Sequence, residues 1–412
     1  MKSTGFLVST LLGSAAVIPA AVISFAPLAS TNSQMPADVV VVPASTDRQV
    51  QRATLVPQAT PTPSPCLQGI ATNVNATVPD EVCNQVNSSN IANIVVVVGN
   101  ASGELYRYQV GNDDFKSQTL VASGGKLLLG VLAMRMVEAN QVSLTAPAST
   151  YFNYWAAPGS TDDRRTEKLE FLLAQNGGFN RGILINGCAD NGSYTLQACA
   201  RQIYTSGLAS AWPEGKHYPG TVFSYGAQDL QLAAALLESA GGGPNFNTLM
   251  RNYVTGPGAL NMTNTEYKDT LLQTSNPTNP YVAKNLWSTT DDYSKLLTAL
   301  LGGNFVTDLD RLFTARTTSA QKLGFVPPSV VADGDWQYAQ ASWVVCHRAT
   351  FDAACAADKI NSSPGLYGWT PWIDRVHGYW ALIAMHQSSP QGDTVAVPLA
   401  KALEAPIVAH LP

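Results

Sequence analysis

The sequence lacks the cysteine and histidine motifs that hold zinc in most zinc proteins. It contains no C-x-x-C and no H-E-x-x-H, and its five histidines are scattered along 412 residues. Because zinc sites are built from closely spaced ligands of these types, we do not expect a zinc site. No other pattern implies a metal ion or an organic cofactor, so none is expected.

Charge is also scarce. Only 13% of the residues are charged, the formal net charge is -5, and no Lys/Arg cluster occurs. Nucleic acids and anionic membrane surfaces are bound through basic patches, so the sequence argues against both as partners. With 45% hydrophobic residues, the composition is that of a globular protein.

Long hydrophobic runs are absent beyond the N-terminal region. There, Lys2 precedes a mostly apolar run over residues 6–29, which predicts a secretory signal peptide over residues 1–30; an uncleaved membrane anchor is the alternative. Residues 31–65 are polar and rich in proline and threonine, and we expect them to form a propeptide or linker. We therefore expect a secreted, extracellular protein with no stable membrane partner after signal cleavage.

The six cysteines lie in three pairs that are close in sequence. An even number of cysteines in a secreted chain favours disulfides. Because neighbouring cysteines pair most readily, the expected disulfides are Cys66 with Cys83, Cys188 with Cys199, and Cys346 with Cys355.

A serine and a lysine three residues apart, Ser123 and Lys126, stand at the start of an apolar stretch. Residues 118–122 are predicted to be extended and residues 127–138 to be helical, so Ser123 is expected at a strand-to-helix transition. Positions i and i+3 share one face of a helix, which lets the Lys126 amine reach the Ser123 hydroxyl. Burial and the positive end of the helix both disfavour the ammonium form, and a free amine can take the serine proton. The pair predicts nucleophilic acyl transfer.

The same spacing recurs at Ser319 and Lys322. About one such match is expected by chance in a chain of this composition. The second match has neither a strand before it nor a long apolar helix after it. We interpret residues 319–322 as a surface segment.

Strand patterns gather at the two ends of the globular region, and a mainly helical stretch lies between them. The predicted strands cover residues 94–98, 105–108, 340–345, 366–373 and 379–385, and a last helix covers residues 398–405. The pattern predicts an α+β fold over residues 66–412. One antiparallel sheet is assembled from both chain ends and flanked by helices, with a mainly helical insertion at about residues 145–320 and the Ser123 helix at the junction.

From about residue 90 onward, these features resemble the serine beta-lactamase, penicillin-binding protein and related esterase family. Four segments carry the resemblance. They are the nucleophile segment at 119–126, a helix and turn at 165–179, the Tyr225 segment at 219–225, and a helix start at 288–293. The resemblance implies a beta-lactamase/transpeptidase-like fold.

The resemblance also implies roles for particular residues. Ser123 would be the nucleophile and Lys126 the general base. The Tyr225 phenol would help to deprotonate Ser123 or protonate the leaving group; a packed tyrosine with no catalytic role is the alternative. The oxyanion hole would use the Ser123 amide and an amide on the strand leading to Gly365. Ser362, Ser363 and Gly365 would form the substrate-binding strand.

Two departures from the family pattern bear on the substrate. Ala227 stands where the Y-x-N motif has asparagine, and no K-T-G or H-x-G precedes Gly365, although Lys359 is an alternative correspondence. In members that recognise beta-lactams, these motifs hold the amide and carboxylate of the substrate, so their loss weakens the antibiotic and peptide interpretations more than an esterase interpretation. His377 lies in the turn after the strand and is expected to be exposed.

Two further groups are candidates for the walls of the cleft. The segment from Cys188 to Cys199 is either a substrate-gating lid or a stapled surface loop. Five tryptophans line either an acyl pocket or the core: Trp155, Trp212, Trp369, Trp372 and Trp380.

The sequence therefore predicts a secreted serine hydrolase that cleaves small-molecule carboxylic esters or small amides through an acyl-enzyme. Two alternatives stay open. One is a beta-lactamase or D-alanyl-D-alanine carboxypeptidase, and the other is a non-catalytic secreted binding protein that keeps the fold.

Overall fold

The apolar residues 94–98 contribute side chains to two separate hydrophobic cores. In the computed structural model of the protein, alternate side chains of β2 (Ile94–Asn100) point to opposite faces of a sheet. Val96 and Val98 pack into one core, and Val95 and Val97 into the other. A strand covered on both faces needs apolar residues at every position, which explains the unbroken run.

The structure describes residues 64–181, 187–211, 215–243, 245–269 and 273–412. The predicted signal peptide and all but the last two residues of the predicted propeptide or linker lie outside the described residues. Over the described ranges, no helix combines the length and the apolar character that crossing a membrane requires.

Among the described residues, eight strands form the main sheet in the order β1-β3-β2-β13-β12-β11-β10-β9, with every neighbouring pair antiparallel. The N-terminal strand β2 pairs directly with the C-terminal strand β13, so the predicted sheet from both chain ends is confirmed. The other strands of this sheet are β1 (Ile70–Asn73), β3 (Gly103–Val110), β9 (Gln337–Tyr338), β10 (Trp343–Val344), β11 (Ile360–Ser362), β12 (Thr370–Asp374) and β13 (Tyr379–Ala384).

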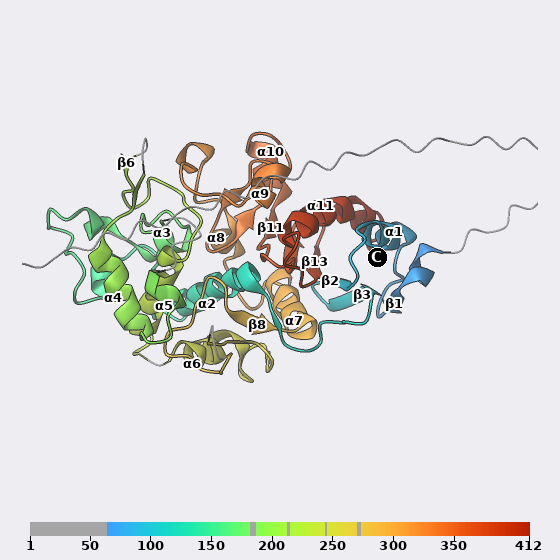
Figure 1. Ribbon diagram of the computed structural model, residues 1–412, viewed down its shortest axis with the longest axis horizontal. Coiled ribbons are helices and arrows are strands. Elements are labelled where there is room, and N and C mark those ends of the chain that lie inside the picture. Colours follow the sequence, from blue (N-terminus) through green and yellow to red (C-terminus); the bar gives the residue numbers. More distant parts are fainter. Residues whose placement is uncertain (1–63, 182–186, 212–214, 244, 270–272) are drawn as a thin grey trace, which may run out of the picture. The chain divides into compact units, whose positions relative to one another are not determined.

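Helices cover both faces of this sheet. Figure 1 shows α1 (Asp80–Ser88) and α11 (Asp393–Ala409) on one side and α7 (Thr290–Leu301) on the other. The α1 and α11 side packs into the core that holds Val96, whereas α7 packs with Val95. The two cores fix the sheet between helices, as the predicted α+β fold requires.

Between β3 and β9 the described chain is mainly helical, as predicted. It contains α2 (Lys126–Glu138), α3 (Leu169–Leu173), α4 (Leu196–Ser206), α5 (Gln228–Ala240), α6 (Phe246–Met250), α7, α8 (Leu309–Phe313) and α9 (Pro328–Asp333); α10 (Ala353–Asp358) follows β10. Two small sheets accompany these helices. One has the order β4 (Thr119–Leu120), β8 (Leu286–Ser288), β7 (Glu266–Tyr267), and the other pairs β5 (Ser210–Ala211) with β6 (Gly215–Lys216).

Three predicted elements have wrong bounds. Residues 339–342 form a turn between β9 and β10, since Ala341 has a φ of 59° and the Ala339 N–H donates to the Ser342 carbonyl. A second turn, with a Gly368 φ of 103°, delays β12 until Thr370. The last helix begins at Asp393, before the predicted start. Apolar residues in buried turns look like strand residues in the sequence, which explains the first two errors.

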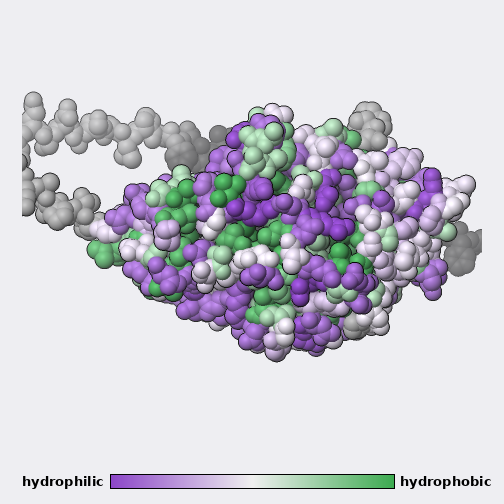
Figure 2. Space-filling view, turned by 180° about the vertical axis from the view of Figure 1, so that it is seen from behind, coloured by the Kyte–Doolittle hydropathy of each residue, from purple (hydrophilic) through white to green (hydrophobic). Residues whose placement is uncertain are grey.

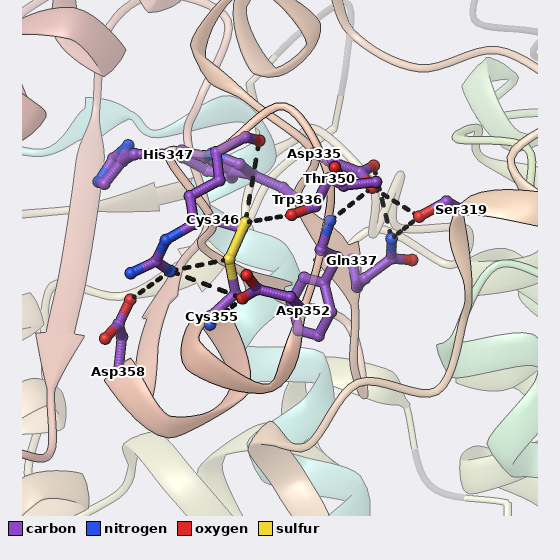
Figure 3. The surroundings of a disulfide bond; sticks show 12 residues. Ser319, Asp335, Trp336, Gln337, Cys346, His347, Thr350, Asp352, Cys355 and Asp358 are labelled. Atoms are coloured by element: carbon purple, nitrogen blue, oxygen red, sulfur yellow. Dashed lines mark hydrogen bonds and ion pairs between the residues drawn. A yellow bond between two sulfur atoms is a disulfide. The ribbon is translucent and has the colours of Figure 1, made fainter.

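The three expected disulfides are present: Cys66–Cys83, Cys188–Cys199 and Cys346–Cys355. The Cys346–Cys355 disulfide links the segment that follows β10 to helix α10, and hydrogen bonds and ion pairs surround it (Figure 3). On the face shown in Figure 2, hydrophobic residues gather in small groups between hydrophilic ones.

Candidate active site

Ser123 lies on a strained turn between β4 and α2. The preceding residue, Ala122, is buried and has a φ of 49°, in the left-handed region that residues with a side chain rarely adopt. Residues 122–125 then form a single 3-10 turn that leads into α2. Strain of this kind persists where the surrounding structure holds it, and it is common at active sites.

The two glycines after Ser123 let the helix start pack without side chains. A Cβ on Gly124 would lie 2.9 Å from Cδ1 of Trp369, and one on Gly125 would lie 2.7 Å from Cβ of Leu286. The Tyr293 hydroxyl donates to the Gly124 carbonyl at 2.7 Å. The turn that carries Ser123 is therefore fixed by close contacts on several sides.

The Lys126 amine is in place to act on Ser123. Its Nζ lies 2.7 Å from the Ser123 Oγ and 2.5 Å from the Ala283 carbonyl oxygen. The side chain is buried, and no carboxylate of the described residues lies within ion-pair distance of it. Burial lowers the pKa of Lys126 to about 7, because the ammonium loses its hydration without gaining a counter-ion. A substantial fraction of free amine is therefore present at neutral pH.

Tyr225 is a further polar side chain beside Ser123, after Lys126. Its hydroxyl is hydrogen-bonded with Ser123, and its ring stacks on Trp343 with centroids 5.5 Å apart. The Lys126 Nζ lies 4.7 Å from the centroid of the same ring. Burial raises the pKa of Tyr225 far above its ordinary value, so the phenol keeps its proton. Tyr225 can therefore donate a proton or a hydrogen bond, but it is a poor base.

The three predicted catalytic residues Ser123, Lys126 and Tyr225 meet in one cavity of about 300 Å³. The other lining residues are Ala122, Gly226, Ala227, Tyr281, Ala283, Lys284, Pro327, Ser329, Val330, Trp343, Pro364, Leu366, Gln391 and Asp393. The cavity is mostly apolar, with a few polar groups near the nucleophile, as small-molecule sites usually are.

The three residues predicted on the substrate-binding strand do not line this cavity themselves. The Ser362 hydroxyl donates to the Pro371 carbonyl at 2.8 Å, away from the cavity. The Ser363 hydroxyl donates to the Ser123 carbonyl at 2.9 Å and so holds the nucleophile turn. A Cβ on Gly365 would lie 2.3 Å from the carbonyl oxygen of Val121, so only glycine permits the approach of this strand to the turn. Their neighbours Pro364 and Leu366 form the cavity wall.

Other candidates from the sequence lie elsewhere. Lys359 is half exposed, 4.0 Å from Asp310, and is not part of the cavity wall. His377 is exposed, as expected, and contacts Asp374 at 2.6 Å. The described residues 187–199 do not line the cavity, which favours the stapled loop over the lid.

Four of the five tryptophan candidates are buried core residues: Trp155, Trp369, Trp372 and Trp380. Trp212 lies outside the described residues. The tryptophan of the cavity wall is Trp343, which the sequence placed only in a strand. Sequence analysis also missed the Ala283 carbonyl that accepts from Lys126, and it missed Asp393 in the wall. No local pattern marks these residues.

In the parts of the chain that the structure describes, no three His, Cys, Asp or Glu side chains converge to form a metal site.

A family model for beta-lactamases matches residues 82–405, which is most of the chain. The chain belongs to the beta-lactamase family. The members of this family are serine hydrolases, so the predicted family is confirmed.

Solved structures with the same fold include three of differing function. One is a beta-lactamase from Mycobacterium bovis, with a TM-score of 0.54 and 17% identity, covering 80% of this chain and 100% of that chain. Another is EstCE1, a hydrolase with promiscuous acyltransferase activity, with a TM-score of 0.57 and 17% identity over 78% of this chain and 98% of that one. The third is simvastatin synthase from Aspergillus terreus, with a TM-score of 0.57 and 17% identity, covering 81% of this chain and 99% of that chain. At these identities the likeness establishes the beta-lactamase fold alone. No curated protein matches the chain by sequence.

Proposed function

We propose that this protein hydrolyses small carboxylic esters, and small amides more slowly, through an acyl-enzyme on Ser123. One observation carries the proposal. The Lys126 amine lies 2.7 Å from the Ser123 Oγ and has a pKa of about 7, with no carboxylate to hold its charge. A general base is most effective when its pKa lies near the working pH.

Acylation begins with Lys126 as the base. The free amine takes the Ser123 proton as Oγ attacks the substrate carbonyl carbon, and a tetrahedral oxyanion forms. The resulting Lys126 ammonium is held by the Ala283 carbonyl, which already accepts from Nζ. The protonated Tyr225 phenol beside Ser123 then supplies a proton to the departing alcohol oxygen, and Lys126 reprotonates it. In deacylation, a water molecule attacks the carbonyl carbon of the acyl-enzyme, and Lys126 and Tyr225 transfer protons in the reverse direction. The carboxylic acid is then released from Ser123.

Two backbone amides are suited to bind the oxyanion. The Ser123 N–H lies at the start of the helical turn, where amides point toward a developing negative charge. Across the cavity, the Gly365 N–H is already used by the Trp369 carbonyl at 2.8 Å, whereas the Leu366 N–H has no acceptor among the described residues. Leu366 also lines the cavity, so we place the second donor there.

The cavity favours esters over beta-lactams. Ala227 in the cavity wall offers no amide to hold a substrate carboxamide. The strand that leads to Gly365 carries Ser363 rather than a lysine, and Ser363 is occupied with the Ser123 carbonyl. Ester cleavage needs mainly the nucleophile, the base and the oxyanion donors, all of which this site offers.

Secretion is part of the proposal. Three disulfides are compatible with an extracellular protein, because disulfides persist in oxidising surroundings. The apolar segment at residues 6–29 supplies the predicted export signal.

Intact-mass measurement tests the proposal. The protein is mixed with an activated short-chain ester and, separately, with a penicillin, and Ser123→Ala is treated in the same way. An acyl adduct from the ester that is absent in Ser123→Ala supports the esterase. An adduct from penicillin alone favours a beta-lactamase or carboxypeptidase, and no adduct from either reagent with folded protein favours the binding protein.

A further inference from the structure

Asp393 is a buried carboxylate in the wall of the active-site cavity that the mechanism does not use. It is only 7% exposed and begins helix α11. No Lys, Arg or His of the described residues lies within ion-pair distance of its carboxylate. Glu167 and Asp229 are also buried without an ion-pair partner among the described residues, but neither lines the cavity. A buried carboxylate without a counter-ion is costly to keep, so its presence in a ligand cavity suggests a role in binding.

The polar contacts of Asp393 fix its carboxylate in the cavity wall. The Ser329 hydroxyl of α9 donates to Oδ2 at 2.7 Å, and the N-terminus of α11 favours a negative charge at this position. Burial raises the pKa of Asp393, and the hydrogen bonds from Ser329 and from the first backbone N–H groups of α11 act in the opposite direction and favour the carboxylate. Asp393 and Tyr225 line the same cavity.

Lys284 also lines the cavity but forms no ion pair with Asp393. Lys284 lines the cavity from the segment that leads into β8, and among the described residues its amine has no ion-pair partner. The carboxylate of Asp393 therefore has no cationic partner among the described residues and is open to a cationic group of a ligand.

We propose that Asp393 selects substrates whose alcohol or acyl part carries a positively charged group, and disfavours anionic substrates. The cavity of about 300 Å³ is large enough for a small ester with one ammonium group. A cation within a few ångströms of the carboxylate gains attraction in a site with little water, whereas a substrate carboxylate is repelled. The inference rests on the proposed ester hydrolysis and names its substrate class.

Matched thioesters test the inference. Three acetyl thioesters are used whose thiols end in a trimethylammonium, a tert-butyl or a carboxylate group, which differ in charge at nearly equal size. A second set places the same three groups at the end of the acyl chain of nitrophenyl esters. The measured quantity is the ratio of kcat/KM for the cationic substrate to that for its neutral isostere, in the wild type, Asp393→Asn and Lys284→Gln. Near-ultraviolet circular dichroism checks that each variant is folded.

We expect a ratio of about ten or more in at least one set for the wild type, falling to within about threefold of one in Asp393→Asn. Lys284→Gln, the matched control in the same cavity wall, should keep or raise the ratio. A wild-type ratio near one in both sets overturns the inference even if Asp393→Asn does not fold, and so does an unchanged ratio in folded Asp393→Asn. Ser123-dependent cleavage of the neutral esters without charge preference refutes only the inference. Absence of any cleavage refutes the proposed function and the inference with it.

Discussion

The spacing of a serine and a lysine three residues apart occurs twice in this chain, in different surroundings. At Ser123 and Lys126, the amine is buried and donates to a hydroxyl and a carbonyl oxygen, with no carboxylate of the described residues as a partner. At Ser319 and Lys322, both side chains are bonded to one carboxylate, that of Asp335. Figure 3 shows Ser319 directed at Asp335 near the Cys346–Cys355 disulfide.

The two lysines differ mainly in their counter-ion. The Lys322 side chain is only 13% exposed, so it is also largely removed from water. Lys322 forms an ion pair with Asp335, whereas Lys126 has no such partner among the described residues and its pKa falls to about 7. The comparison teaches that burial without a carboxylate, and not the S-x-x-K spacing, turns a lysine into a base.

Removing each serine should separate the two sites most strongly. Ser123→Ala is expected to lose at least about a thousandfold in kcat/KM on an activated ester, since the nucleophile is gone. Ser319→Ala should keep the wild-type rate, because Ser319 contacts Asp335 and Gln337 and does not line the cavity. Steady-state hydrolysis measures both, and equal losses in the two variants would contradict the account.

Removing each lysine comes next in size. Lys126→Met should lower kcat/KM by about a hundredfold to a thousandfold, the usual contribution of a general base. Lys322→Met should leave the rate within about twofold and instead cost about 1–3 kcal/mol of unfolding free energy, because Asp335 loses its partner. Steady-state kinetics and urea unfolding of both variants check these expectations. A loss of rate in Lys322→Met with none in Lys126→Met would contradict the assignment of Lys126 as the base.

Tyr225→Phe should have a smaller effect. The ring keeps its stacking on Trp343, so the fold is retained, but the hydroxyl beside Ser123 is lost. We expect a fall in kcat/KM of about tenfold to a hundredfold. The fall should be smaller for esters with good leaving groups, which need less proton donation. A variant as active as the wild type on a poor leaving group would show that Tyr225 is only a packing residue.

His347 tests how ion pairs hold the region around Cys346. Burial alone would lower the pKa of His347, but hydrogen bonds to Asp333 and Glu404 outweigh it and raise the pKa to about 9. Since the folded pKa lies above the ordinary value of 6.5, the stabilisation is complete below pH 6.5 and is lost as the pH rises through about 9. His347→Gln should cost about 1–2 kcal/mol at pH 6 and much less at pH 10. A cost that stays the same across this range, measured by urea unfolding, would contradict the ion-pair account.

Features that depend on neighbouring residues were predictable from the sequence. Ser123 and Lys126 meet within one helical turn, and each disulfide closes a short loop. The run at residues 94–98 was long enough to indicate a buried strand. The role of Tyr225 came from the family resemblance, because nothing in its own segment shows that it reaches Ser123.

Features that depend on distant segments were not predictable. The Ala283 carbonyl, the Trp343 ring and the Asp393 carboxylate come from three separate parts of the chain, and only tertiary packing brings them to Ser123. The turn at Ala341 was missed for a related reason, since its residues are buried like those of a strand. The lowered pKa of Lys126 likewise depends on what is absent around it, which a single sequence does not reveal.

The most direct test of the account is the titration of Lys126 itself. Protein labelled with carbon-13 at the lysine ε position is titrated by NMR, and the Lys126 signal is identified by its absence from Lys126→Arg. The account predicts that this signal titrates near pH 7. If the missing signal titrates at the ordinary lysine value of about 10, Lys126 is an ammonium at neutral pH, and the claim that burial without a counter-ion makes it the base is wrong.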